Sequence, residues 1–189
     1  MAEDWPKIVS RRTTKVSPWM QLIEREVEFA QGGPHHLYHA VAQHDYIAIV
    51  AQTPDGRIPI VRQYRPALEA FTWELPAGMV DKDEQPEACC RRELREETGF
   101  LAKTVHALGA YAPCTARLSN RVHSFFVEIG DQAGPKSEAD IELRLVTLEE
   151  LTELVLDGEF TLQLHIGALL LAGMHGFIDL GALNPAGRF

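Results

Sequence analysis

Three carboxylates lie close together in a short predicted helix. Glu93, Glu96 and Glu97 fall between Pro86 and Gly99. A proline suits the first turn of a helix, and a glycine suits the residue after its end. At 100° per residue, Glu93 and Glu97 point about 40° apart and Glu96 lies about 60° from Glu93, so all three share one side. Like charges at this spacing repel, which leaves two explanations: a solvated acidic surface, or a bound divalent cation such as Mg²⁺ or Mn²⁺.

The residues around these carboxylates form a longer pattern that decides between the two explanations. Gly78 is followed after five residues by Glu84 and, after seven more, by RELREETGF at 92–100. The whole segment resembles the Nudix box at every fixed position. The resemblance implies an α+β fold in which a mixed β-sheet is sandwiched between helices (α/β/α). It also implies a hydrolase that acts on a nucleoside diphosphate linked to another group.

The resemblance also implies roles for individual residues. It implies metal ligands at Glu93, Glu96 and Glu97, with the backbone carbonyl of Ala77 as a further ligand. Arg92 would orient Glu96. The implied cofactor is Mg²⁺, with Mn²⁺ as an alternative. Such ions neutralise phosphate oxygens, lower the pKa of a bound water and align its attack on phosphorus.

The segment before the box narrows the substrate class. Residues 63–78, QYRPALEAFTWELPAG, resemble the ADP-ribose pyrophosphatases. The resemblance implies hydrolysis of ADP-ribose, or a similar nucleoside-diphosphate sugar, to AMP and ribose 5-phosphate. Arg65 would contact the diphosphate or the terminal ribose, with Arg62 as a second candidate. Glu74 would hydrogen-bond the substrate or support a metal. A surface arginine on a strand is the alternative interpretation of Arg65.

Other functions remain as alternatives at this point. The loop after 110 departs from the subgroup, because Cys114 stands at a glycine position and Arg121 at a glutamate position. GDP-mannose, UDP-glucose, a dinucleoside polyphosphate or a coenzyme are therefore alternative substrates. A non-catalytic, nucleotide-sensing domain is a further alternative, but such domains usually lose box carboxylates, and here all three are kept.

Two roles implied by the resemblance belong to residues outside the box. The catalytic base of such enzymes often comes from a later loop, and Glu138 and Asp140 are both available here, with Glu138 preferred. A general base must reach the attacking water, which spacing alone does not show. Trp19 matches an aromatic position used by related enzymes to stack adenine, in a region exchanged across a dimer. We therefore expect a homodimer, with a core or interface tryptophan as the alternative role of Trp19.

Several further elements are expected to carry these residues. Alternating or continuous apolar runs predict strands, and longer apolar runs predict helices. Strand-like content is found at 16–30, strands are predicted at 46–53, 58–66, 72–77, 104–112, 121–129 and 141–148, and helices near 148–156 and 161–174. We expect three parts: an antiparallel strand region for dimerisation and base binding at 1–44, the Nudix domain at 45–175, and a tail at 176–189.

Composition excludes several classes of function. The 189 residues carry a net charge of −9, which argues against nucleic acid or an anionic membrane as a partner. The apolar stretch at 162–174 is shorter than the roughly 20 residues of a membrane span. The first residues lack the apolar core of a signal peptide. Three cysteines cannot build a disulfide framework, which favours a reducing compartment, so we expect a cytoplasmic protein. Its expected partner is a small molecule, the nucleoside-diphosphate sugar.

Overall fold

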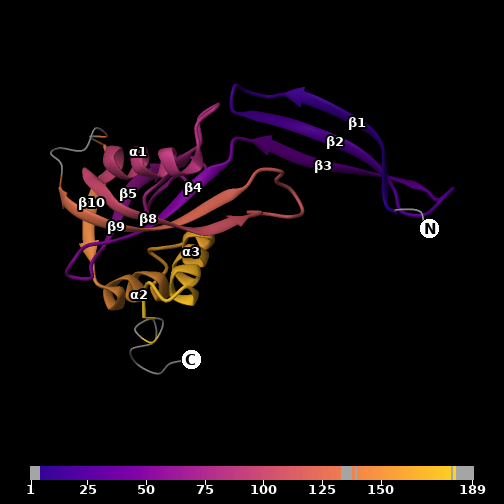
Figure 1. The fold of residues 1–189 in the computed structure, drawn as a ribbon. Helices are drawn as coiled ribbons and strands as arrows, with labels where there is room; N and C mark the ends of the chain where they lie inside the picture. The colour runs from indigo at the N-terminus through magenta and orange to yellow at the C-terminus, as the bar shows by residue number, and fades with distance from the viewer. Residues whose placement is uncertain (1–4, 133–137, 139, 180, 182–189) are drawn as a thin grey trace. The chain divides into compact units, whose positions relative to one another are not determined.

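The computed structural model describes residues 5–132, 138, 140–179 and 181. These residues form two compact units (Figure 1). Among the described residues, the first unit contains 5–45 and 111–121, and the second contains 46–110 and the residues from 122 onward. No described helix is both long enough and apolar enough to cross a membrane.

The first unit is built on a three-stranded antiparallel sheet in the order β1-β2-β3. Its strands are β1 (Lys7–Lys15), β2 (Met20–Glu28) and β3 (His35–Gln43). The strand-like content at 16–30 corresponds to β2. Strand β1 lies within the strand region expected at 1–44, but its bounds are not predicted, because every one of its residues is exposed. Cross-strand pairs compensate for the missing burial. Arg12 of β1, for example, forms an ion pair with Glu24 of β2.

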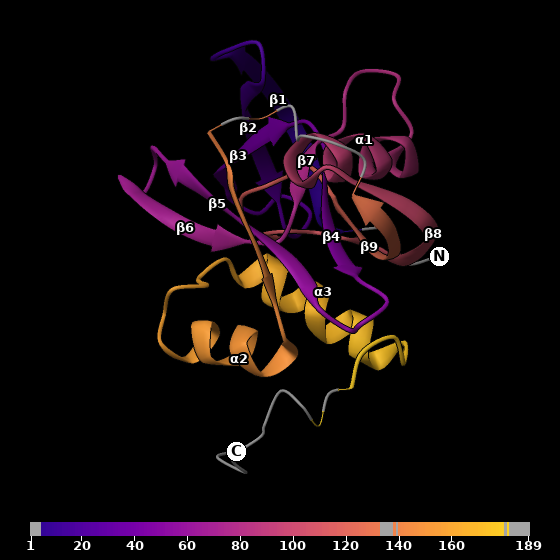
Figure 2. The same ribbon diagram turned by 90° about the vertical axis from the view of Figure 1, so that its left-hand side faces the viewer.

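The second unit contains two further sheets and three helices. The four-stranded sheet has the order β7-β4-β9-β8, and the three-stranded sheet the order β10-β5-β6. Figure 2 shows β5 and β6 side by side. The strands are β4 (Tyr46–Gln52), β5 (Ile58–Arg65), β6 (Ala70–Glu74), β7 (Ala77–Met79), β8 (Phe100–Tyr111), β9 (Val122–Gln132) and β10 (Glu142–Val146). The helices are α1 (Pro86–Thr98), α2 (Leu148–Leu156) and α3 (Gln163–Met174). All but the short β7 had been predicted, within a few residues.

Strand β4 shows how the layers are joined. It pairs in parallel with β9 and antiparallel with β7, so the sheet is mixed. Successive side chains of a strand point to opposite faces. Ile47 and Ile49 belong to the apolar cluster that contains Leu94 of α1, whereas Ala48 and Val50 belong to the cluster that contains residues of α2 and α3. Helix α1 thus covers one face of the sheet and α2 and α3 the other (Figure 1), which confirms the predicted sandwich.

Helix α1 begins and ends where its sequence predicts. Pro86 occupies the first turn, and Gly99 follows the helix with a left-handed φ of 76°. Glycine adopts this conformation without steric cost, so the Gly99 N–H can donate to the carbonyl of Arg95 at 2.9 Å. Cys90 and Leu94 are fully buried against the sheet. These contacts fix which side of α1 presents its carboxylates.

Candidate active site

Helix α1 places its three box glutamates in different environments. Glu93 and Glu97 are buried, with exposed fractions of 8% and 3%, whereas the Glu96 side chain is 34% exposed. Burial raises the pKa of Glu93, although a hydrogen bond from Arg92 opposes the rise. Buried carboxylates need compensation by partners or cations. The partners of each glutamate therefore indicate what the site can hold.

A cluster of carboxylates forms where α1 meets the loop before β10. One oxygen from each of Glu93, Glu96 and Glu138 lies within 4.8 Å of the others. The backbone N–H of Glu138 donates to the carbonyl of Glu96 at 3.3 Å, which ties the loop to the helix at this point. Asp140, the other predicted loop carboxylate, is exposed and outside the cluster. Three oxygen donors at this separation fit a divalent cation such as Mg²⁺ or Mn²⁺.

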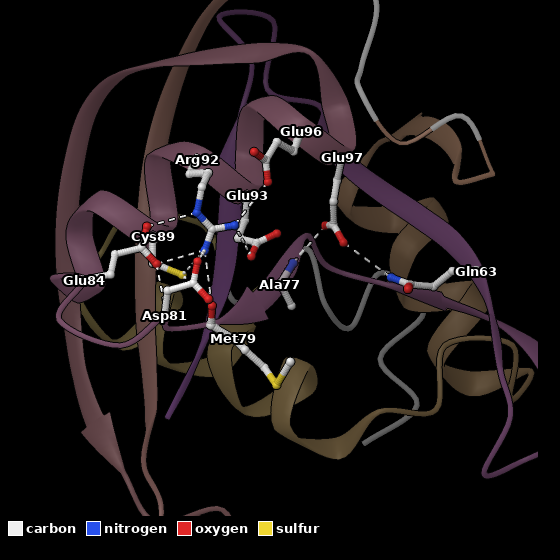
Figure 3. A network of polar contacts seen from close by, with 10 residues as sticks. All are labelled: Gln63, Ala77, Met79, Asp81, Glu84, Cys89, Arg92, Glu93, Glu96 and Glu97. Carbon is white, nitrogen blue, oxygen red and sulfur yellow. Dashed lines mark hydrogen bonds and ion pairs between the residues drawn. The ribbon is translucent and has the colours of Figure 1, made fainter. Parts of the chain in front are cut away.

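Arg92 links the carboxylates on its side of α1 (Figure 3). Its guanidinium makes a two-pronged contact with Glu84, with both N–O distances at 2.9 Å. It also donates to Glu93 at 2.6 Å and to Glu96 at 3.1 Å, and to the carbonyl of Met79 at 3.2 Å. The hydrogen bonds from Arg92 lower the pKa of Glu84 to about 2. Arg92 therefore holds two of the clustered carboxylates in position, including its predicted partner Glu96.

Glu97 lies apart from the cluster and has its own partners (Figure 3). Its Oε2 accepts the backbone N–H of Ala77 at 3.0 Å, and its Oε1 accepts the amide of Gln63 at 3.5 Å. Burial raises the pKa of Glu97 to about 8, and the charges of Glu93 and Glu138 add to the rise, against the hydrogen bond from Ala77. A carboxylate in such an environment gains most from a nearby cation. The structure thus places Ala77 beside Glu97, and the contact is made by the backbone N–H of Ala77.

The comparisons with known proteins match this arrangement. The model of the NUDIX domain family matches residues 42–164. The chain belongs to the Nudix hydrolase family. An ADP-ribose pyrophosphatase of Mycobacterium tuberculosis is 33% identical over 176 residues, which are 90% of this chain and 84% of that protein. A solved ADP compounds hydrolase shares the Nudix fold at 19% identity, with a TM-score of 0.79 over 94% of this chain and 100% of its own.

Two further relatives match smaller parts of this Nudix chain. An ADP-ribose pyrophosphatase of Bacillus subtilis is 37% identical over 113 residues, so the match spans 58% of this chain and 61% of that protein's length. A CMP-5'-(N-acetyl-N-hydroxy-3-aminopropyl)phosphonate hydrolase of Streptomyces rubellomurinus is 31% identical over 148 residues, or 77% of this chain and 72% of that protein. The resemblance to ADP-ribose pyrophosphatases seen in the sequence is thereby confirmed, as a similarity to such proteins.

Arg65 and Glu74 form an ion pair beside the Nudix box. Arg65 Nε donates to Glu74 Oε1 at 2.7 Å and Nη2 donates to Oε2 at 2.5 Å, while the Thr72 hydroxyl donates to Oε1 at 2.6 Å. Burial alone would raise the pKa of Glu74, which is 2% exposed, but these hydrogen bonds outweigh it and lower the pKa. The Arg65 side chain is 38% exposed. It can therefore hold Glu74 and still meet an anionic ligand.

The remaining sequence candidates lie elsewhere. Side chains alternate along β5, so Arg62 faces away from Gln63 and Arg65. Its guanidinium lies 5.1 Å from the centre of the Phe71 ring and 3.4 Å from Glu142. Trp19 stands just before β2 in the first unit and is 59% exposed. The structure therefore does not bring Arg62 to the carboxylates of α1, and it leaves the Trp19 ring open to a partner.

A cavity of about 680 Å³ adjoins the Nudix box. Gln63 and Ala77, the partners of Glu97, form part of its wall, as does the Arg65–Glu74 pair. His165 of α3, which the sequence analysis did not single out, completes the wall. Its signal in the sequence is a titratable residue inside a mostly apolar helix. Most of the remaining wall is apolar, as is typical of small-molecule sites.

Proposed function

We propose that this protein is a Mg²⁺-dependent pyrophosphatase that hydrolyses ADP-ribose, or a similar nucleoside-diphosphate sugar, to AMP and ribose 5-phosphate. The observation that carries the proposal is the convergence of Glu93, Glu96 and Glu138 from a helix and a separate loop. Two ADP-ribose pyrophosphatases among the relatives support the choice of substrate. The cavity lined by Gln63 and Ala77, the two partners of Glu97, offers space for the organic part of such a molecule.

The residues present fit a divalent cation. Glu93, Glu96 and Glu138 offer oxygen donors only, the ligand type that Mg²⁺ and Mn²⁺ prefer. Glu97 is a further ligand in this proposal, and the Ala77 carbonyl another. A bound cation would neutralise diphosphate oxygens and make a water more acidic. It would also offset the repulsion among carboxylates that stand within one turn of each other.

The chain's own residues would share the remaining work. In the reaction, the oxygen of a water forms a bond to one phosphorus, and the bridging P–O bond of the diphosphate breaks. Glu138 is exposed and belongs to a loop outside α1, and its carboxylate lies beside those of Glu93 and Glu96, so we assign it to accept the proton of a water at the cluster. Arg65 would bind the diphosphate with the part of its guanidinium that Glu74 leaves open. Arg92 would hold Glu93 and Glu96 in place throughout.

The first unit would complete the site in a homodimer. Trp19 exposes a flat aromatic surface, which suits stacking with a nucleobase. Exposed apolar side chains are frequent in the same unit, and a second copy of the chain would cover them: Ile8, Val9, Phe29, Leu37 and Tyr38. We also propose a cytoplasmic location, since the three free cysteines suit a reducing compartment.

A second substrate class is favoured by one relative. The Streptomyces protein is named for hydrolysis of a CMP derivative, so a base other than adenine is a specific alternative. GDP-mannose, UDP-glucose and dinucleoside polyphosphates belong to the same test. They differ from ADP-ribose in the base or in the group beyond the diphosphate, and every one contains the linkage that the carboxylates would act on.

The proposal is tested by product analysis on a substrate panel. Purified protein is incubated with Mg²⁺ and equal concentrations of ADP-ribose, ADP-glucose, UDP-glucose, GDP-mannose and diadenosine diphosphate, and the products are separated by anion-exchange chromatography. We expect the highest kcat/KM for ADP-ribose, with AMP and ribose 5-phosphate formed in equal amounts. Higher kcat/KM for a UDP or GDP sugar would replace the adenine assignment. Absence of turnover across the panel would contradict the proposed activity.

A further inference from the structure

His165 is a buried histidine with one fixed hydrogen bond. It is 4% exposed, and its Nδ1 accepts the backbone N–H of Leu75 at 3.0 Å. Burial lowers the pKa of His165 to about 4, and the charge of Glu74 only partly opposes this. The ring is therefore neutral at pH 7, and because Nδ1 is the acceptor, the single proton lies on Nε2. The fold thus presents a neutral Nε2–H donor of defined direction.

His165 forms part of the wall of the cavity beside the box. Among the described residues, no group accepts a hydrogen bond from Nε2. The only described side-chain atom that is both fully enclosed and without a partner is Oδ1 of Asn120. Nε2 therefore keeps access to open space, and the cavity is the space that His165 lines. A polar side chain this deeply buried, with an unused donor at a cavity wall, is suited to a ligand.

The wall around His165 indicates which part of the ligand would meet it. Gln63 and Ala77 join the cavity to Glu97 of the box, so the diphosphate would lie at that end. Arg65 and Glu74 line the same cavity. His165 lies on α3 and is bonded to Leu75, the residue that follows Glu74. A neutral donor has little preference for phosphate, which the cationic Arg65 meets better.

We infer that His165 binds the terminal sugar of a nucleoside-diphosphate sugar, by donating its Nε2–H to an uncharged hydroxyl or ring oxygen. The inference rests on the proposed function and adds a specificity-determining residue to it. Thr72 and Glu74 line the same cavity and offer further hydrogen-bonding groups suited to hydroxyls. The alternative is a purely structural histidine, which satisfies Leu75 and packs near Phe160 at 6.3 Å between ring centres.

A matched pair of substitutions separates the two roles. His165→Asn keeps an acceptor near the position of Nδ1 for the Leu75 N–H but removes the distal donor. His165→Gln places an amide N–H near the position of Nε2 but leaves the Leu75 N–H without its acceptor. We expect H165N to raise KM for ADP-ribose about 3- to 10-fold, with thermal stability near that of the unmodified protein. We expect H165Q to lose thermal stability and to keep a lower KM than H165N.

The β-methyl ester of ADP, which has the diphosphate but no terminal sugar, locates the contact. If His165 binds the sugar, H165N and the unmodified protein should show the same kcat/KM on this ester. An equal loss on both substrates would place the contact on the shared ADP group and overturn the inference. Unchanged KM in H165N, with lower stability in both variants, would likewise overturn it in favour of a structural role.

A spectroscopic readout keeps this inference separable from the proposed function. In ¹⁵N-labelled protein at pH 7, His165 should show the neutral tautomer with its proton on Nε2, and added ADP-ribose should shift the Nε2 signal. No turnover of any substrate, together with this shift, would contradict the proposed function but support the sugar contact. Turnover of ADP-ribose without any shift would support the function and overturn the contact.

Discussion

Gly78 and Glu93 are in such close contact that a side chain on the glycine would displace the Glu93 carboxylate. A Cβ atom on Gly78 would stand 2.0 Å from both Cδ and Oε1 of Glu93. The first glycine of the box, at the centre of β7, is thus explained by the packing of a buried carboxylate. Glu93 is also held by Arg92 at 2.6 Å, so a displacement of its carboxylate would disturb both this ion pair and the carboxylate cluster.

Gly78→Ala should therefore damage both the fold and the site. Overpacking in a well-packed region typically costs about 1–3 kcal/mol, and displaced Glu93 should lower kcat at least about 10-fold. Gly167→Ala in α3 is the control, since nothing lies within 4 Å of its Cβ position. In a helix that change should stabilise by about 0.5–1 kcal/mol. Chemical denaturation and initial rates measure both. A fully active, fully stable G78A would contradict the packing described here.

Arg65 should contribute to stability, through its ion pair with Glu74, and separately to substrate binding. Arg65→Ala leaves the buried Glu74 carboxylate uncompensated and should cost about 1–3 kcal/mol, a range reduced because Arg65 is 38% exposed. Adding Glu74→Gln removes the unpaired charge and should restore part of that stability. If Arg65 also binds the diphosphate, the double variant should keep a raised KM. Recovery of KM together with stability would show that Arg65 acts only through Glu74.

His165 should make stability depend on pH between its two pKa values. Its pKa is about 4 in the folded chain and about 6.5 when unfolded. Below pH 6.5 the unfolded chain therefore binds the additional proton, and the free energy of unfolding falls as the pH is lowered toward 4. At pH 5, compared with pH 7.5, this contribution is about 2 kcal/mol. The charges of Glu74 and Arg65 also act on His165, in opposite directions.

The difference between the unmodified protein and H165N isolates this contribution, because other groups titrate in both. Urea unfolding of both proteins at pH 5 and 7.5 should show H165N gaining about 2 kcal/mol relative to the unmodified protein at the lower pH. A difference that does not change with pH would mean that His165 is not held neutral by burial.

Mixing two variants should reveal whether Trp19 serves a partner's site. Trp19→Ala should raise KM about 10-fold by loss of base stacking, and Glu93→Gln should abolish most of kcat. If Trp19 completes the site of the other subunit, a mixed dimer can place both defects in one site and leave its second site intact. Activity of the mixture should then exceed the sum of the separate variants. Simple additivity, in a dimer confirmed by light scattering, would assign Trp19 to its own chain's site or to packing.

The box helix and the layers around it were predictable because local signals define them. Pro86 and Gly99 bracket α1, and the buried run of β4 is apolar on both faces, as a strand between two helical layers requires. Strand β1 could not be predicted in this way. Its residues are all exposed, so it has no apolar periodicity, and it is held by pairing with β2.

Side-chain partnerships within the site were harder to predict than its members. In the β5–β6 hairpin Arg65 pairs with Ala70 and Glu74 pairs with Val61, so the ion pair depends on the reach of the arginine side chain along the sheet and not on direct pairing of the two residues. Both residues are candidates in the sequence, but no feature of the sequence indicates that they form a pair. The partners of Arg62 depend on which face of β5 its side chain occupies. That face is known only once the register of β5 with its neighbours is known. His165 was overlooked because nothing in an apolar helix indicates which backbone group its ring will face.

The most direct test of the central claim is the rate of AMP release from ADP-ribose as a function of Mg²⁺. The unmodified protein should be active with Mg²⁺ and inactive with excess EDTA, and Mg²⁺ should restore the activity. Glu93→Gln should lower kcat by at least about 100-fold, whereas Glu87→Gln, an exposed change on the same helix that affects only the pair with Arg91, should not lower it. AMP release that persists in EDTA, or an E93Q rate within twofold of the unmodified protein, would contradict metal-dependent hydrolysis at this carboxylate cluster.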